Sequence, residues 1–298
     1  MSRNASIHEL PEPIRTKLRS TTILTSLPQV VSELVQNSLD AGASQIDVGV
    51  DCDVWECWVK DNGVGMSRDG LALLAQGPEA GRYNSSKAYS PASLDSVSTF
   101  GFRGEALASA ADVSCIEISS RTARSRETWS TILKNGQRLY EGPAVRWRRE
   151  TAGTVVCLRD VFYNLPIRRR SHPSPSKTMD LIRREIEVYA LVFPNVSFSL
   201  EDVHKSREAG LDKGRVMTIP KTRSIVASFR NIFGRALCQH VEEIDASQDT
   251  CQLHGFISLD GAHTKSHQYL YVNHHPLSPC HLHQLIDNIF SASTFSKH

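Results

Sequence analysis

The chain has 298 residues, with 34 Lys and Arg against 32 Asp and Glu, which gives a formal net charge of +2. Hydrophobic residues make up 40% of it and charged residues 22%, and the mean hydropathy is −0.29. These values are typical of a globular protein long enough for two domains, and they exclude a collagen-like repeat, a disordered polar chain and a membrane bundle. Because the net charge is close to zero, any nucleic-acid-binding surface must come from local clusters.

The cysteines and the N-terminus indicate a compartment. Seven scattered cysteines without a C-x-x-C pair favour reduced thiols over a disulfide framework. The first 20 residues contain Pro11 and Pro13 and no apolar run, so we expect no signal peptide. Both features favour the cell interior.

The first strong pattern predicts a helix over residues 26–43. Ser26 and Gln29 fit a capping box, and Gly42 is placed to end the helix. Its apolar residues share one side: Val31, Leu34, Val35 and Leu39. Its polar residues lie within about 60° of one another on the opposite side: Glu33, Asn37 and Asp40. A polar helix face is usually a solvated surface, so this one gains meaning only from the motifs that follow.

Glycine-rich motifs follow the next predicted elements. A strand pair at 46–50 and 54–60 precedes D-N-G-V-G-M at 61–66, and residues 76–99 are typical of a long loop. G-F-R-G-E then opens an Ala-rich helix over 106–111. The remaining elements expected in this part are strands at 114–120, 128–133, 137–140 and 153–159, a hairpin turn at Asn135-Gly136, a helix at 178–192 and a strand at 196–200.

The charged stretch 201–214 has no periodicity, and we interpret it as a linker. It divides the chain into an expected domain at 1–205 and a smaller one at 206–298. The elements expected in the second domain are strands at 215–219, 250–258 and 267–273, and helices at 223–234 and 281–290.

Together these motifs could form a nucleotide site without a P-loop, because no G-x-x-x-x-G-K-[ST] and no Rossmann fingerprint occur. Magnesium prefers hard oxygen ligands and keeps several waters, so the Asn37 carboxamide and phosphates would suffice. Glu33 could polarise an attacking water. Asp61 could accept a hydrogen bond from an adenine amino group, and the glycines of 101–104 let backbone N–H groups approach phosphates.

Five motifs resemble the MutL family of DNA mismatch-repair proteins. They are E-L-V-Q-N-S-L-D-A-G-A at 33–43, D-N-G-V-G-M at 61–66, G-F-R-G-E-A-L at 101–107, A-G-T-V-V at 152–156 and V-F-Y-N-L-P-I-R-R-R at 161–170. The segments R-T-K-L-R-S and R-Y-N-S-S-K are most similar to the third eukaryotic MutL homologue, which is associated with meiosis.

The resemblance implies Glu33 as the general base, Asn37 as the magnesium ligand and Asp61 as the adenine-binding carboxylate. The other nucleotide-binding residues that it implies, including the lid and phosphate cradle, are Asp40, Gly63, Gly65, Met66, Ser86, Lys87, Gly101, Phe102, Arg103, Gly104 and Thr154. The implied fold is a two-layer α+β sandwich, the GHKL (Bergerat) ATPase fold, followed by a smaller and incomplete ribosomal-protein-like α/β domain.

The implied function is that of an ATP-gated clamp that uses ATP and Mg in mismatch repair or meiotic recombination, in the nucleus. Its implied partners are another MutL homologue in a heterodimer, MutS-type proteins and DNA, with no membrane contact. Two alternatives stay open: an ATP-binding interaction module with little turnover, and another GHKL-superfamily ATPase such as a chaperone, type II topoisomerase or sensor kinase.

Two departures from the family pattern affect these expectations. The segment around 76–81 is a few residues longer than usual, at the position of the lid. The family's second domain continues past the strand matched by Val272 and Asn273 to a phosphate-sensing lysine, which has no counterpart before His298. We therefore expect a truncated second domain, weak ATP hydrolysis and no endonuclease region.

Two weaker patterns concern metals and DNA. We expect the histidines from His263 to His283, beside Cys280, to lie at the surface or partly buried rather than to bind zinc, because no second Cys pair completes a tetrahedral set. The stretch 159–184 carries a local charge of +5 and suggests weak, phosphate-directed DNA contact. The candidate DNA-binding residues are Arg168, Arg169, Arg170 and Lys177.

Overall fold

The computed structural model describes residues 20, 22–74, 99–101, 105–209, 211–249, 251–259 and 265–292. The chain divides into two compact units: Met1–Ile182 with Leu200–Val216, and Arg183–Ser199 with Met217–His298. Among the described helices, none combines the length and the apolar character needed to cross a bilayer.

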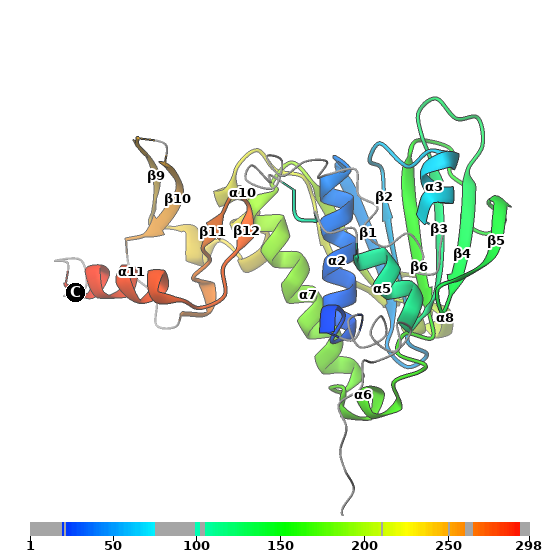
Figure 1. Cartoon of the computed structure of the whole chain (residues 1–298). Helices are drawn as coiled ribbons and strands as arrows, with labels where there is room; N and C mark the ends of the chain where they lie inside the picture. Colours follow the sequence, from blue (N-terminus) through cyan, green and yellow to red (C-terminus); the bar gives the residue numbers. More distant parts are fainter. Residues whose placement is uncertain are drawn as a thin grey trace, which may run out of the picture. The chain divides into compact units, whose positions relative to one another are not determined.

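The first eight strands form one sheet in the order β5-β4-β3-β6-β2-β1-β7-β8 (Figure 1). These strands are β1 (Gln45–Asp51), β2 (Glu56–Asp61), β3 (Cys115–Arg121), β4 (Trp129–Lys134), β5 (Gln137–Pro143), β6 (Gly153–Arg159), β7 (Ser197–Asp202) and β8 (Arg215–Ile219). The pairs β1–β2, β2–β6, β6–β3, β3–β4 and β4–β5 are antiparallel. Asn135 and Gly136 join β4 to β5 with φ of 53° and 71°, the backbone that a two-residue hairpin turn requires.

Helix α2 (Leu27–Asp40) lies with α5 (Ala106–Val113) on one face of this sheet, as Figure 1 shows. The N-terminal signal is confirmed, because the Ser26 side chain accepts the N–H of Gln29 and Pro28 occupies the first turn. Gly42, at φ 69°, follows the C-terminal end. Val31, Leu34 and Val35 are fully buried against β1 and β2, so the two-layer α+β arrangement is confirmed.

The described residues before β7 also form α3 (Arg68–Leu74), α6 (Pro166–Ser171) and α7 (Pro175–Val192). The sequence patterns did not predict α3 and α6, each of which is about two turns long or shorter. Short helices of this kind depend on tertiary contacts rather than on their own periodicity; Arg68, for example, lies over the Trp129 ring of β4 at 4.3 Å.

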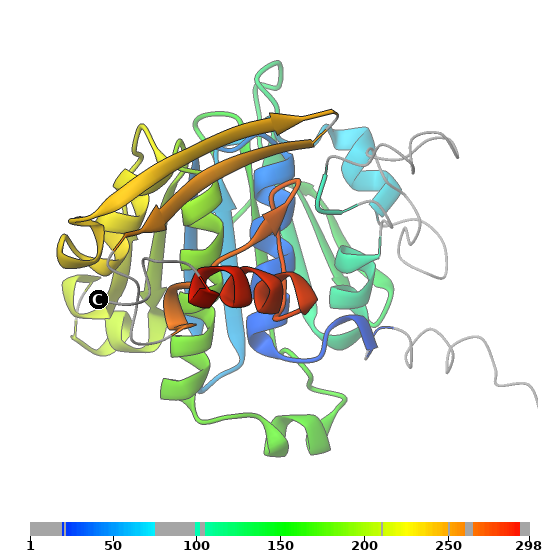
Figure 2. The same ribbon diagram turned by 90° about the vertical axis from the view of Figure 1, so that its left-hand side faces the viewer.

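The second unit is the smaller of the two. Its elements include α10 (Ile225–Phe233), β9 (Val241–Gln248), β10 (Cys251–Ser258), β11 (Tyr271–Val272), β12 (His275–Pro276) and α11 (His281–Ala292). The antiparallel β9–β10 pair forms the long hairpin in Figure 2. A small core gathers around Leu191, Phe229 and Cys238. The strand expected at 267–273 is wrong for most of its length, since only Tyr271–Val272 is extended and a 3-10 turn occupies Lys265–His267.

The irregular linker expected at 201–214 is also wrong. This stretch forms two helices, α8 (Val203–Ala209) and α9 (Leu211–Gly214). Asp202 accepts the N–H of Lys205 at the start of α8, and Arg207 pairs with Asp51 at 3.2 Å. The charges that suggested a solvated linker are therefore partly used in a cap and a tertiary ion pair.

Candidate functional site

The polar face of α2 is present as expected. Glu33, Asn37 and Asp40 are all partly exposed, whereas the opposite side of the helix is buried. Gln29 donates from Nε2 to Oε1 of Glu33 at 3.0 Å, one turn earlier on the same face. This contact orients the Glu33 carboxylate on the polar face of the helix.

Asp61, the last residue of β2, is buried beside the C-terminal half of α2. Its Oδ1 accepts the backbone N–H groups of Gly63 at 2.8 Å and Thr154 at 3.2 Å. Its Oδ2 lies 3.2 Å from the Ser38 hydroxyl, which is also 3.2 Å from the Leu34 carbonyl. The carboxylate is thus oriented from three elements of the fold, which is how a protein fixes a buried acceptor for a specific ligand group.

The loop 61–66 approaches other backbone too closely for side chains. A Cβ on Gly65, where φ is 71°, would lie 2.1 Å from the Arg121 carbonyl oxygen. A Cβ on Gly153, where φ is 134°, would lie 2.2 Å from the Asp61 carbonyl oxygen. Glycine is therefore required at both positions by geometry as well as by backbone conformation.

Ser120 joins the two glycine segments. Its hydroxyl accepts the Met66 N–H at 2.7 Å and lies 2.8 Å from the Thr154 hydroxyl and 3.2 Å from the Gly153 carbonyl. Nothing in the sequence around Ser120 suggested this role, because its partners lie 54 and 34 residues away in the chain.

Opposing effects act on the ionisation of Asp61. Burial raises the pKa of this carboxyl above its ordinary value, while the hydrogen bonds from Gly63, Thr154 and Ser38 and the nearby Arg149 guanidinium pull the pKa back down. Arg149 also donates from Nη2 to the Asp61 carbonyl oxygen at 2.6 Å. Arg149 and Ser38 were not predicted as site residues, because both contact Asp61 from outside its own motif.

Phe100 and Gly101, which precede and begin the G-F-R-G motif, contact the C-terminal end of α2. The backbone N–H groups of Phe100 and Gly101 donate to Oδ1 and Oδ2 of Asp40 at 2.9 and 3.0 Å. Five predicted site residues lie outside the described residues: Ser86, Lys87, Phe102, Arg103 and Gly104. The structure therefore brings together the other nine predicted positions around α2, the loop 61–66 and the start of β6, and says nothing of the lid.

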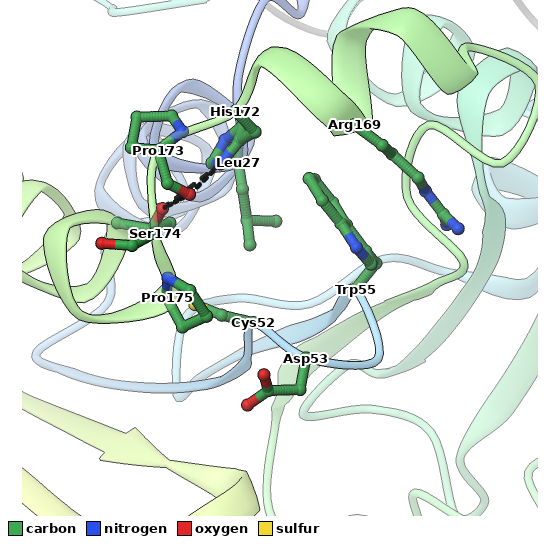
Figure 3. A pocket seen from close by; sticks show the side chains of 10 residues that line it. Leu27, Cys52, Asp53, Trp55, Arg169, His172, Pro173, Ser174 and Pro175 are labelled. Carbon is green, nitrogen blue, oxygen red and sulfur yellow. Dashed lines mark hydrogen bonds between the residues drawn. The ribbon is translucent and has the colours of Figure 1, made fainter.

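A separate pocket of about 300 Å³ lies at the N-terminal end of α2 (Figure 3). Its walls include Trp55, Arg169 and His172, so it is distinct from the residues around Asp61. His172 accepts the Leu27 N–H through Nε2 at 3.2 Å, and its Nδ1 lies 3.2 Å from the Thr178 hydroxyl. The pocket is therefore built around contacts that fix the first turn of α2.

One group of metal-ligating side chains occurs among the described residues, and it is Asp51, Asp53 and His204. Asp51 already pairs with Arg207 and accepts the N–H groups of Asp53 and Val54. A carboxylate that is committed to a guanidinium is a poor cation ligand, so this group is a structural ion pair. The backbone N–H and the Sγ of Cys280 lie 3.3 and 3.4 Å from Nδ1 of His283.

The four basic residues expected at DNA differ in their surroundings. Arg168 donates to the Leu24 carbonyl at 2.7 Å, and Arg169 donates to the Val161 carbonyl at 2.8 Å and lies over the Trp55 ring. Arg170 and Lys177 are exposed. Two of the four candidates thus hold the fold together, and two are available to a phosphate backbone.

Comparison with known proteins places this geometry in a family. Residues 25–144 match the model of histidine kinase-, DNA gyrase B- and HSP90-like ATPases, and residues 229–298 match that of the DNA mismatch repair protein, C-terminal domain. The chain is 34% identical over 275 residues to the DNA mismatch repair protein Mlh3 of Homo sapiens and 39% identical over 207 residues to MLH3 of Arabidopsis thaliana. The chain belongs to the MutL family of DNA mismatch-repair proteins.

The extent of each match differs. The alignment with the human protein covers 92% of this chain but 18% of that protein, and the alignment with the Arabidopsis protein covers 68% and 17%. MutL of Thiobacillus denitrificans is 31% identical, over 90% of this chain and 42% of that protein. The chain therefore spans less than half of these MutL-family relatives.

Solved structures confirm the fold of this MutL-family chain. The N-terminal domain of a DNA repair protein superposes with a TM-score of 0.72 at 22% identity and covers 94% of this chain and 82% of its own. The Aquifex aeolicus MutL ATPase domain complexed with ADP gives a TM-score of 0.62 at 24% identity, over 89% and 88%. The GHKL ATPase fold predicted for the first domain is thus confirmed.

Proposed function

We propose that this chain binds ATP with Mg and hydrolyses it at the site around Asp61, and that it acts as the ATP-gated part of a MutL-type clamp. The observation that carries the proposal is the Asp61 carboxylate, buried and oriented by the N–H groups of Gly63 and Thr154. It lies beside the helix whose exposed face presents Glu33 and Asn37.

Each residue has a role that its chemistry permits. The Asp61 carboxylate accepts a hydrogen bond from the exocyclic amino group of adenine, which guanine lacks at that position. The Thr154 hydroxyl lies 2.8 Å from Ser120 and belongs to the residue whose backbone N–H holds Asp61. Glu33 accepts a proton from the water that attacks the γ-phosphate.

The magnesium ion fits the donor set on α2. Asn37 offers a neutral, hard carboxamide oxygen one turn after Glu33, and Mg²⁺ is commonly bound by one or two protein oxygens together with phosphates and waters. When bound, the ion would supply charge neutralisation at the phosphates. Asn37 would hold it close enough to Glu33 for the water and the ion to share one helix face.

The lid and the glycine-rich motif at 101–104 would contact the phosphates. Lys87 and Arg103 supply cations in this proposal, and Gly101 and Gly104 allow close approach of the backbone, as the family resemblance implies. Ordering of the lid by ATP would promote pairing with another MutL homologue, and hydrolysis would reset it. Contact with MutS-type proteins, a nuclear location and a role in repair or meiotic recombination belong to the same proposal.

DNA contact is part of the proposal through Arg170 and Lys177, whose exposed side chains lie on α6 and α7. Phosphate-directed contacts of this kind are weak individually and sensitive to salt. Arg168 and Arg169 would act indirectly, since their guanidinium groups hold Leu24 and Val161.

The proposal is tested by measuring phosphate release and ATP binding by the 298-residue chain and by its Glu33→Ala and Glu33→Gln variants. We expect both variants to bind ATP with nearly unchanged affinity and to lose turnover by about 10²–10⁴-fold, the usual contribution of a general base. Glu208→Ala, on the exposed face of α8, removes the same kind of group and should leave both quantities unchanged. Where the wild type hydrolyses ATP, equal rates in the Glu33 variants would refute the assignment; ATP binding without any hydrolysis by the wild type would favour the interaction module.

A further inference from the structure

The C-terminal end of α2 is the point where the glycine motifs of the first unit meet. The Ala41 carbonyl accepts the Val64 N–H at 3.0 Å, and a Cβ on Gly63 would lie 2.6 Å from the same oxygen. One residue earlier, the Asp40 carboxylate receives the N–H groups of Phe100 and Gly101. The loop that carries Asp61 and the segment that begins G-F-R-G are therefore both fastened to the helix that carries Glu33 and Asn37.

Asp40 is an unfavourable residue for its place in the helix. A carboxylate at the last helical position lies at the negative end of the helix dipole, and no basic residue occurs in the last turn to compensate. Aspartate is also a weak helix former. Such a conflict between a residue and its local structure is expected where a tertiary function has been favoured over local stability.

The Asp40 contacts supply that function. Two successive backbone N–H groups donate to the two oxygens of one carboxylate, at 2.9 and 3.0 Å, which fixes both the distance and the orientation of the 99–101 segment. The Thr99 hydroxyl donates to the Gly101 carbonyl at 3.1 Å and stiffens the same segment. The Gly101 N–H is thereby directed toward Asp40, so it does not point toward a phosphate in this arrangement.

We infer that Asp40 is a positioning residue for the segment 99–101, which leads into G-F-R-G, and makes no direct contact with the nucleotide: its carboxylate sets this segment against the helix that bears Glu33 and Asn37. This assignment rests on the proposed ATP site and replaces the nucleotide-binding role that the family resemblance implies for Asp40. Loss of the carboxylate should leave the adenine-binding end around Asp61 intact and displace the phosphate-binding end.

The contact itself is tested without nucleotide. Amide hydrogen exchange at Phe100 and Gly101 is measured in the whole chain for the wild type, Asp40→Asn and Asp40→Ala. Asparagine keeps one acceptor oxygen and places an NH₂ group where the second acceptor was. We therefore expect these two amides to exchange at least about tenfold faster in Asp40→Asn than in the wild type. Asp180→Asn, an exposed position on α7, makes the same charge change and should not alter them. Unchanged exchange in both Asp40 variants would refute the inference.

The role is tested by comparing ATP with adenosine, which lacks phosphates. We expect Asp40→Asn to weaken ATP binding by roughly ten- to a hundredfold, the effect of losing hydrogen bonds to a charged group, and to leave adenosine affinity unchanged. An equal loss for both ligands would make Asp40 a general stabiliser of the fold and overturn the inference. Tighter ATP binding would also overturn it, because the carboxylate would then be competing with phosphate for the two N–H groups. A wild type that binds neither ligand would contradict the proposed ATP site, whereas the exchange experiment would still decide whether Asp40 holds the 99–101 segment.

Discussion

Thr154 donates its backbone N–H to Oδ1 of Asp61 over 3.2 Å, although 93 positions separate the two residues in the chain. The pairing of β2 with β6 creates this contact, since Lys60 lies opposite Val155 in the antiparallel register. The end of one strand and the start of another thereby become a single hydrogen-bonded unit. The buried carboxylate is held by the sheet itself, so its position does not depend on a bound ligand.

The first prediction follows from the partners of Asp61. In Asp61→Asn the carboxamide oxygen can still accept the Gly63 and Thr154 N–H groups, but the NH₂ group replaces the oxygen that would accept from adenine. We expect ATP binding to weaken by at least about tenfold, as for the loss of one buried acceptor, and the preference for ATP over GTP to decrease. Titration of both nucleotides into both proteins measures this, and unchanged affinity for both would contradict the adenine assignment.

The same substitution should not destabilise the fold. Burial raises the pKa of Asp61, so the folded chain binds this proton more readily than the unfolded chain, and the free energy of unfolding decreases as pH rises through the interval between the two pKa values. Above that interval the ionised carboxylate therefore lowers stability. Urea unfolding at neutral pH should give an Asp61→Asn midpoint no lower than that of the wild type, which separates loss of binding from loss of structure.

The second prediction compares two glycines. Gly65→Ala places a Cβ 2.1 Å from the Arg121 carbonyl at φ 71°, so we expect a loss of stability well above 1 kcal/mol and loss of nucleotide binding. Gly70→Ala in α3 meets only the Ser67 hydroxyl at 3.4 Å, and there alanine should stabilise by about 0.5–1 kcal/mol. The midpoint of thermal unfolding should fall for Gly65→Ala and rise for Gly70→Ala. Equal shifts of the two midpoints would mean that the backbone at Gly65 relaxes freely.

The sequence predicted the parts of the site that carry local signals. Ser26, Gly42 and the apolar positions of α2 fix that helix through capping and periodicity, and the motif D-N-G-V-G-M marks the turn after β2. Ser38, Ser120 and Arg149 were not predicted, because each acts through partners brought close only by strand pairing. These polar residues contact Asp61 or its neighbours only once the chain is folded.

The elements that the sequence missed or misread have a common cause. Helix α8 depends on the ion pair of Arg207 with Asp51, which is 156 positions away, and no local pattern records such a contact. Strand β9 is exposed along nearly all of its length, so it lacks the apolar alternation that marks a half-buried strand. Local periodicity identifies elements that are buried on one side, and it fails where distant charges or a single pairing strand supply the stability.

The third prediction concerns pH and His172. Its Nε2 accepts the Leu27 N–H, so the neutral ring carries its proton on Nδ1, next to the Pro173 carbonyl at 3.3 Å and the Thr178 hydroxyl. Protonation of Nε2 would remove the acceptor from the first turn of α2. Burial lowers the pKa of His172 below its ordinary value of 6.5, and the contact with Pro173 opposes this only in part.

The unfolded chain therefore binds the His172 proton at a higher pH than the folded chain. The free energy of unfolding should decrease as pH falls from the pKa of His172 in the unfolded chain toward its pKa in the folded chain. Below the pKa in the folded chain, His172 should cause no further decrease. Urea unfolding between about pH 7.5 and about pH 5.5 measures the effect. His172→Gln keeps an acceptor that does not titrate, so its stability should depend less on pH than that of the wild type; identical slopes would exclude His172 as the cause.

The fourth prediction distinguishes the two kinds of arginine near α6. Arg170→Ala with Lys177→Ala should weaken binding of duplex DNA with little change in stability, because both side chains are exposed. Each lost phosphate contact should also reduce the slope of log affinity against log salt by about 0.9. Arg168→Ala should instead lower the midpoint of thermal unfolding, since its guanidinium donates to the Leu24 carbonyl and lies 5.4 Å from the centre of the Phe162 ring.

The matched control removes two positive charges elsewhere on the first unit. Arg124→Ala with Arg126→Ala, both exposed in the turn before β4, changes the net charge by the same amount. A general electrostatic attraction would respond equally to both double variants, whereas a local contact would respond only to the loss of Arg170 and Lys177. Because nonspecific binding depends on the number of phosphates neutralised, the salt slope decides between these outcomes more sharply than the affinity at any one salt concentration. Equal slopes for the two double variants would assign DNA binding to the overall charge of the chain and would remove Arg170 and Lys177 from the proposed contact surface.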